Sequence, residues 1–171
     1  MEADGYIALG SNLGDREANL RAGLLGMSRL GLPQVALSSV WATEPVDSPE
    51  PLWFLNMVAG VRTPLFPEEV LERLLEIEAG VGRVRSVRNA PRLLDLDLLL
   101  LGGERREGPG LLLPHPRMWE RRFVLAPLDE IAPRLSNPAT GRTVREELGA
   151  LRGSHAVRRV GALALPGARP L

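Results

Sequence analysis

Two aspartates, Asp95 and Asp97, stand inside the otherwise apolar run LLDLDLLLL. The run is typical of a β-strand, in which alternate side chains share one face about 6.6–7 Å apart along the chain. Two carboxylates on one face are costly to bury unless a positive charge meets them. Mg²⁺ is usually bound by one or two carboxylates together with substrate phosphates. The pair therefore indicates a Mg²⁺ site, and the alternative is a half-exposed strand whose polar residues face water.

Arginines crowd the segment just before this pair, with no acidic residue among them. Within ten residues the chain places Arg83, Arg85, Arg88 and Arg92. Guanidinium groups bind phosphate oxygens in a bidentate manner, and arginine clamps with Mg²⁺ are typical of phosphoryl transfer, where catalysis is mainly positioning and charge neutralisation. The segment favours a small polyanionic ligand such as a nucleotide. The alternative is a solvated basic face.

A second group of residues could hold a flat heterocycle. Phe54 and Phe123 are two of three phenylalanines, and together they could stack on both faces of a ring. Asn56 shares a strand face with Phe54 and could read the edge of the ring with its amide. His115 lies between two prolines with Arg121 nearby, and its ring could donate to a phosphate or ribose oxygen. A purely structural role for this histidine stays open.

The composition of the 171-residue chain excludes several kinds of site. There is no Cys, which excludes disulfides, thiolate nucleophiles and Cys-ligated metals. All 21 basic residues are Arg, so a Walker A lysine and Schiff-base chemistry are also excluded. The two histidines, His115 and His155, are too far apart for an H-E-x-x-H zinc helix. A net charge of zero argues against a dedicated nucleic-acid binder.

The chain shows no sign of a membrane or secretory segment. No apolar run approaches the ~20 residues that span a bilayer, and the acidic N-terminus lacks the basic region of a signal peptide. We therefore expect a cytoplasmic protein with no membrane or nucleic-acid partner, and no obligate protein partner is evident. Residues 1–160 are expected to form one domain, followed by a Pro- and Gly-rich tail over 161–171.

The elements that must position these residues follow from the apolar periodicity. Their order predicts the split β-α-β-β-α-β arrangement, an α+β fold with two helices on one face of an antiparallel sheet. A short helix over 142–151 is also expected. The main elements are strands over 6–9, 35–43, 52–61 and 93–101, helices over 15–30 and 67–79, and a hairpin that returns at 111–113.

One carboxylate occupies an apolar stripe of the second helix. The expected core face is formed by Val70, Leu71, Leu74 and Leu75, and Glu78 continues that stripe. A carboxylate is anomalous at the end of such an apolar stripe.

Four stretches of the chain occur in the order of a known family. Together they resemble 6-hydroxymethyl-7,8-dihydropterin pyrophosphokinase of folate biosynthesis over about residues 6–133. The resemblance implies a ferredoxin-like fold and Mg²⁺-dependent transfer of pyrophosphate from ATP to the pterin hydroxymethyl group, with release of AMP. The stretches are YIALGSNLGDREANL, then WATEPV with FLNMV, then GRVR with APRLLDLDLLL, and finally LPHPRMWERRFVLAPLDEIAP.

The resemblance also implies roles for single residues. Asp95 and Asp97 match the pair that binds two Mg²⁺ ions, and with Arg83 and Arg92 they would form the catalytic set. The residues matching ATP contacts are Glu78, Arg85, Arg92, His115 and Arg121. The residues matching the pterin site and its polar centre are Asn12, Thr43, Val46, Phe54, Asn56 and Phe123.

The sequence departs from the family at two positions and leaves other functions open. Many members carry a Trp in the loop before the Pro-Arg motif (Pro91-Arg92 here), where this chain has Arg88-Asn89-Ala90, and a Gln that some members have one turn before Glu78 is Leu75 here. The main rival is an RRM-like nucleic-acid-binding module, because the same fold carries such domains. An apolar-ligand carrier would leave the arginines and carboxylates unexplained.

Overall fold

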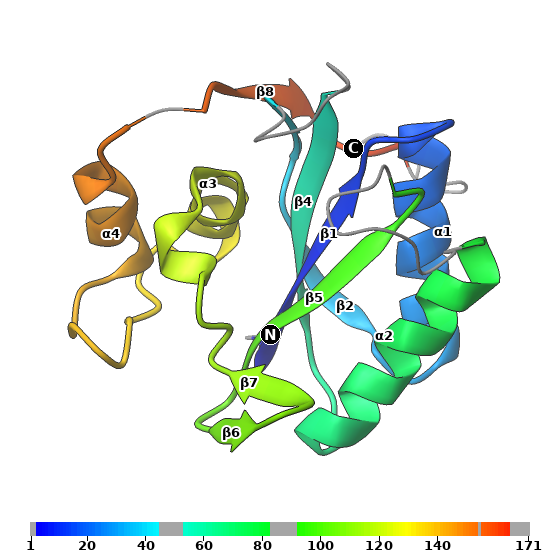
Figure 1. The fold of residues 1–171 in the computed structure, drawn as a ribbon, viewed down its shortest axis with the longest axis horizontal. Coiled ribbons are helices and arrows are strands. Elements are labelled where there is room, and N and C mark those ends of the chain that lie inside the picture. Colours follow the sequence, from blue (N-terminus) through cyan, green and yellow to red (C-terminus); the bar gives the residue numbers. More distant parts are fainter. Residues whose placement is uncertain (1–2, 45–52, 83–91, 154, 165–171) are drawn as a thin grey trace.

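An antiparallel sheet forms the centre of the protein in a computed structural model, which describes residues 3–44, 53–82, 92–153 and 155–164 (Figure 1). The strand order is β5-β1-β4-β3-β8, and β2 pairs with β4. The β-α-β-β-α-β order and the ferredoxin-like α+β fold are thereby confirmed. The strands are β1 (Gly5–Ser11), β2 (Gln34–Leu37), β3 (Val40–Thr43), β4 (Phe54–Val61), β5 (Asp95–Leu101) and β8 (Val157–Gly161).

Two helices, α1 (Arg16–Arg29) and α2 (Pro67–Val81), cover one face of the sheet (Figure 1). The carboxylate of Asp15 caps α1 by accepting from the backbone N–H of Ala18 at 3.0 Å, as an N-cap residue does. Apolar side chains from both helices and from β1, β4 and β5 form the first hydrophobic cluster, which includes Ile7, Leu9, Leu24, Met57, Leu74 and Leu98.

The buried stripe of α2 differs from the expected one. Leu75 is 38% exposed, whereas Ile77 is buried. The helix buries Val70, Leu74 and Glu78 as expected. Leu75 lies one residue past the centre of the stripe, and a step of 100° per residue carries it away from the sheet.

The other face of the sheet is partly covered by a second layer of helices (Figure 1). This layer consists of the 3₁₀ turn η1 (Met118–Glu120), α3 (Arg122–Ile131) and α4 (Val144–Ala150), and the hairpin β6 (Arg106–Gly108) with β7 (Leu111–Leu113) precedes it. A second hydrophobic cluster lies beneath these helices. It includes Val58, Leu99, Leu100, Met118, Val124 and Leu125.

Helix α3 and strand β8 were not anticipated from the sequence. Pro127 lies inside α3, and an internal proline normally argues against a helix. β8 has a mostly exposed sequence, VRRVG, without the apolar alternation that predicts a strand. The predicted short helix over 142–151 is confirmed as α4.

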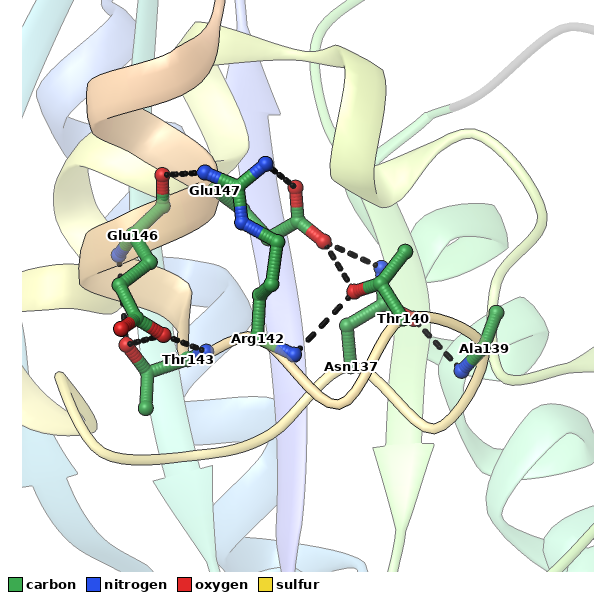
Figure 2. Close-up of polar contacts among 7 residues, drawn as sticks. All are labelled: Asn137, Ala139, Thr140, Arg142, Thr143, Glu146 and Glu147. Carbon is green, nitrogen blue, oxygen red and sulfur yellow. Dashed lines mark hydrogen bonds and ion pairs between the residues drawn. The ribbon is translucent and has the colours of Figure 1, made fainter.

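A polar network fixes the turn that leads into α4 (Figure 2). Glu147 accepts from Asn137 Nδ2 at 2.8 Å and from the hydroxyl of Thr140. Thr143 and Glu146 cap the helix reciprocally, since the Thr143 N–H donates to Glu146 at 2.8 Å and the Thr143 hydroxyl accepts from the Glu146 N–H. These contacts fix the chain at the start of α4.

The expected single strand over 35–43 is divided into β2 and β3 at Ser38 and Ser39. The hydroxyl of Ser38 accepts from Val58 N–H at 2.9 Å and donates to Ser39 C=O at 2.8 Å. A side chain that replaces backbone pairing in this way interrupts a strand. The freed N–H of Ser39 instead donates to Glu130 of α3 at 2.9 Å.

The predicted tail begins inside β8. Leu163 packs against the first hydrophobic cluster, and Arg21 donates to the Ala164 carbonyl at 2.8 Å. Residues 165–171 lie outside the described part of the chain, and the domain boundary at 160 stays a prediction.

Candidate active site

A pocket of about 260 Å³ lies between the sheet and the start of α3. Its floor comes from β1, β4 and β5, and one wall comes from α3. It brings together most of the residues singled out from the sequence, although they come from five separate stretches of chain. The lining includes Ala8, Gly10, Asn12, Thr43, Phe54, Asn56, Arg92, Asp95, Asp97, Arg121 and Phe123.

The carboxylates of Asp95 and Asp97 both line this pocket, as strand alternation predicts. The pKa of Asp97 is raised to about 6, mainly by burial and in addition by the negative charges of Asp95 and Glu78, while Arg121 and Arg92 oppose the shift. Carboxylate oxygens that share one side of a pocket in this way suit a bound cation. Among the described residues no group of three or more His, Cys, Asp or Glu side chains could hold a metal ion by itself.

Strict alternation through LLDLDLLLL would place Leu100 on the same face as Leu96 and Leu98, and this expectation is wrong, because Leu96 and Leu98 lie in the first hydrophobic cluster and Leu100 lies in the second. The pairing of β1 with β5 shifts register between Tyr6 and Ile7. Such a bulge places two consecutive residues of one strand opposite one of the other, so Leu100 turns into the second hydrophobic cluster beside Leu99. The irregularity lies beyond Asp97 and leaves the carboxylate pair on the pocket side.

Arg92 is held at the pocket by two neighbours. Its guanidinium pairs with Asp95 Oδ1 at 2.9 Å, and its backbone N–H donates to Asn12 Oδ1 at 2.7 Å. The Asn12 N–H in turn donates to the Arg92 carbonyl at 3.1 Å. Asn12 therefore positions the arginine next to the carboxylates, and its direct contact with a substrate stays a prediction.

Glu78 lies behind the carboxylate pair, with only 1% of its surface exposed. Its Oε1 accepts from the Leu96 N–H at 2.7 Å. β5 is an edge strand, so this N–H would otherwise lack a partner inside the protein. This contact explains the carboxylate on an apolar helix stripe, whereas the expected contact of Glu78 with ATP stays a prediction.

The opposite end of the pocket combines aromatic rings and one amide. Phe54 at the start of β4 and Phe123 in α3 line the same space, and the Arg121 guanidinium lies 5.6 Å from the centre of the Phe123 ring. Asn56 Nδ2 donates to Thr43 Oγ1 at 2.7 Å, and both side chains are buried. The arrangement can accept a flat ring between aromatic faces with polar groups at its edge.

His115 stands beside this pocket rather than in its lining. Its Nδ1 accepts from the Arg117 N–H at 3.2 Å, so in the neutral ring the proton is on Nε2. Burial lowers the pKa of His115, and the charge of Arg121 lowers it further. At neutral pH the ring can therefore donate one hydrogen bond from Nε2 to an anionic oxygen.

Three predicted site residues, Val46, Arg83 and Arg85, lie outside the residues that the structure describes, and so does Arg88 of the same arginine-rich segment. Five residues of the pocket lining were missed from the sequence: Ala8, Leu9, Gly10, Glu44 and Val124. For Ala8 and Gly10 the only signal was the occurrence of small residues at alternate positions of the first strand.

A larger, open cavity of about 750 Å³ lies on the other side of the sheet, near the start of α1. It is lined by Leu13, Arg16, Trp53 and Arg158, among others, and contains neither carboxylate of the pair. The smaller pocket is therefore the better candidate for chemistry. No helix in the described part of the chain has the length and apolarity needed to cross a membrane.

Comparison with known proteins identifies the family of this chain. The profile of the family 7,8-dihydro-6-hydroxymethylpterin-pyrophosphokinase (HPPK) matches residues 6–133. The 2-amino-4-hydroxy-6-hydroxymethyldihydropteridine pyrophosphokinase of Bacillus subtilis is 45% identical over 143 residues, which are 83% of this chain and 86% of the relative. The enzyme of the same name from Methylorubrum extorquens is 42% identical over 147 residues, 85% of this chain and 92% of the relative.

Solved structures support the fold at greater distance. An HPPK-DHPS crystal structure from Plasmodium falciparum superimposes with a TM-score of 0.65 at 14% identity. The match covers 85% of this chain and 43% of that longer one. The family profile and the bacterial relatives, which extend over most of the sequence, show that the chain is an enzyme of the HPPK family.

Proposed function

We propose that this chain transfers a pyrophosphoryl group from ATP to the hydroxymethyl group of 6-hydroxymethyl-7,8-dihydropterin, in a Mg²⁺-dependent reaction of folate biosynthesis. The products are the pterin diphosphate and AMP. The observation that carries the proposal is the division of one pocket. One end has the aromatic and amide groups that suit a flat heterocycle, and the other has carboxylates and arginines that suit a metal-bound triphosphate.

Asp95 and Asp97 would hold the two Mg²⁺ ions that the family resemblance implies. The residues fit this role, because hard cations take oxygen ligands and because both carboxylates line the same pocket. Two carboxylates leave most coordination positions for phosphate oxygens and water. When bound, Mg²⁺ neutralises charge on the transferring group.

The side chains at the other end orient the acceptor. Phe54 and Phe123 stack on the pterin, while Asn56 and Thr43 fix its edge. This places the hydroxymethyl oxygen toward the carboxylate end. That oxygen attacks the β-phosphorus of ATP and loses its proton. The bond from the β-phosphorus to the α,β-bridging oxygen breaks, and AMP leaves with the bond electrons.

The basic side chains of the site would bind the phosphates of ATP. Arg92 and Arg121 can contact the β- and γ-phosphate oxygens, and His115 can donate from Nε2. Arg92 now pairs with Asp95, and a metal on Asp95 would free the guanidinium for phosphate. Arg83 and Arg85 are proposed as further phosphate contacts on the strength of the family resemblance.

The RRM-like alternative has less support. RRM domains bind RNA on aromatic residues of an open sheet face. Here α3 and α4 pack over part of that face, and Asp95 and Asp97 add negative charge to what is left of it. The absence of nucleic-acid, membrane and protein partners stays a prediction, as does a cytoplasmic location.

Product analysis tests the proposal directly. The protein is incubated with ATP, Mg²⁺ and 6-hydroxymethyl-7,8-dihydropterin, and nucleotides are separated by chromatography. AMP and a pterin diphosphate in equal amounts are expected, and neither forms without Mg²⁺. ADP as the product would overturn the proposal. Binding of an oligonucleotide without any AMP formation would favour the RRM-like alternative.

A further inference from the structure

Gly10 occupies the middle of the pocket floor, between the two ends of the site. In the sheet register it pairs with Asn56 on one side and with Asp95 on the other. Directly paired residues project to the same face, and neighbouring strands are about 4.8 Å apart. The amide end and the carboxylate end are therefore separated by one strand, and the residue between them has no side chain.

The backbone conformation does not explain this glycine. Gly10 is not among the glycines with positive φ, so its backbone is open to any L-residue. A Cβ built on Gly10 would lie 2.8 Å from Asn56 Oδ1, and within 4 Å it would meet no other described atom except Asn56 Cγ at 3.9 Å. The missing side chain thus makes room for one group, the carbonyl of the Asn56 amide.

The Asn56 amide is held in this place from its other end. Nδ2 donates to Thr43 Oγ1 at 2.7 Å, and Thr43 lies on β3, on the far side of β4 from Gly10. The amide therefore spans β4, with its nitrogen toward β3 and its oxygen over β1. Asn56 is 8% exposed, so the amide has little freedom to move elsewhere without losing the Thr43 contact.

We infer that Gly10 is a positioning residue for the pterin, which acts by leaving space for the Asn56 oxygen. The inference rests on the proposed function, because it takes this end of the pocket as the pterin site. With Gly10 in place, Asn56 presents a fixed acceptor to the heterocycle edge.

A methyl group at position 10 should weaken the binding of the pterin but not the binding of ATP. In Gly10→Ala the Asn56 amide must turn away and give up the Thr43 bond. We expect the dissociation constant for 6-hydroxymethyl-7,8-dihydropterin to rise at least tenfold. Affinity for a non-hydrolysable ATP analogue with Mg²⁺ should change less than threefold. Gly108→Ala is the matched control, since Gly108 lies in β6 with no atom within 4 Å of an added Cβ and should leave both affinities unchanged.

A double-mutant cycle with Asn56→Ala separates this role from a general effect on the fold. Asn56→Ala removes the atom that the new methyl would meet, so Gly10→Ala should cost less than a further twofold in pterin affinity on that background. Thermal unfolding should show the same coupling. If Gly10→Ala alone fails to fold and the double variant folds, the competition for space between positions 10 and 56 is supported.

Three outcomes overturn the inference, and they differ in what they say about the proposed function. If Gly10→Ala binds pterin with wild-type affinity while Asn56→Ala binds it weakly, the role of Gly10 is overturned but the pterin site is not. Fully independent effects of the two substitutions also overturn it, because Gly10 would not act through Asn56. If Asn56→Ala itself binds pterin as the wild type does, the pterin site of the proposed function falls, and the role of Gly10 falls with it.

Discussion

Glu78 of α2 and Leu96 of β5 are joined by a hydrogen bond of 2.7 Å from the Leu96 N–H to the buried Glu78 carboxylate. Leu96 is the residue between Asp95 and Asp97. The end of a helix on one face of the sheet therefore fixes the backbone of the strand that presents the carboxylate pair on the other face. The same carboxylate contributes to the raised pKa of Asp97.

Substitutions at Glu78 should distinguish its hydrogen bond from its charge. Glu78→Gln keeps an oxygen that can accept from Leu96, so its free energy of unfolding should stay within about 1 kcal/mol of the wild type. Glu78→Ala leaves a buried N–H unpaired and should cost about 1–3 kcal/mol or more. Urea denaturation of the two variants measures the difference. Equal losses in both would show that the charge, and not the hydrogen bond, stabilises the fold.

Asp97→Asn should stabilise the metal-free protein while removing its activity. The folded pKa of about 6 lies above the ordinary 3.8, so ionised Asp97 destabilises the fold at pH 7. The penalty, on the order of 2–3 kcal/mol, fades as the pH falls through 6 and is gone below the unfolded pKa. At pH 7 the urea concentration at the midpoint of unfolding should be higher for the variant than for the wild type. Near pH 4 the two midpoints should be the same.

The turnover of Asp97→Asn provides a second readout. Loss of a metal ligand should reduce kcat by about 10³ or more, because metal ions contribute several kcal/mol to transition-state stabilisation. Initial rates at saturating Mg²⁺ measure the loss. A variant within tenfold of the wild type would exclude Asp97 as a ligand.

Protons and Mg²⁺ should compete at the carboxylate pair. Below about pH 6 Asp97 takes up a proton, and a protonated carboxyl is a poor metal ligand. At low Mg²⁺ the rate should therefore fall as the pH drops through this range. Higher Mg²⁺ should move the midpoint of the fall to lower pH. Initial rates from pH 5 to 8 at two Mg²⁺ concentrations check this, and a midpoint independent of Mg²⁺ contradicts it.

His115 should be replaceable by Gln but not by Asn. The ring offers a proton from Nε2, because Nδ1 accepts from the Arg117 N–H. The amide nitrogen of Gln can reach the place of Nε2, whereas that of Asn lies near Nδ1. A hydrogen bond to a charged group contributes about 1.5–3 kcal/mol. His115→Asn should therefore weaken binding of a non-hydrolysable ATP analogue about tenfold or more, and His115→Gln about threefold at most. Comparable losses would place the donor elsewhere.

Glu130 should couple α3 to the pterin end of the pocket. Its carboxylate accepts from the Ser39 N–H at 2.9 Å and from Trp41 Nε1 at 2.6 Å, and so ties the helix that carries Phe123 to β3, which carries Thr43. Burial opposes ionisation of Glu130, but the hydrogen bonds outweigh it and lower its pKa. Glu130→Ala should cost about 1–3 kcal/mol of folding free energy and weaken pterin binding more than ATP binding.

Asp129→Ala is the matched control for this prediction. Asp129 lies next to Glu130 on α3 but pairs with Arg145 of α4, in an exposed ion pair that contributes about 1 kcal/mol at most. Its loss should leave both substrate affinities unchanged. Equal effects of the two variants on pterin binding would show that the helix as a whole, and not its attachment to β3, matters.

The sequence by itself determined the β-α-β-β-α-β order of the main elements and the shared face of Asp95 and Asp97. Both depend on local periodicity, because a strand alternates its side chains wherever it lies in a fold. The motif residues could likewise be assigned to a single site, since the family resemblance covers residues 6–133, where all the motifs lie. The strand alternation predicted from LLDLDLLLL held up to Leu98 and failed at Leu100, where the register shift belongs to the pairing with β1.

The tertiary structure alone decided which groups meet. Glu78 and Leu96 are 18 residues apart, and Ser39 and Glu130 are 91 apart, so no periodicity relates them. The strand break at Ser38 and Ser39 and the helix around Pro127 also depend on such distant partners. The carbonyl of Asn56 and the bare backbone of Gly10 come into contact only through the pairing of β1 with β4. Contacts of this kind follow from packing and register, which are properties of the folded chain and not of any local stretch of sequence.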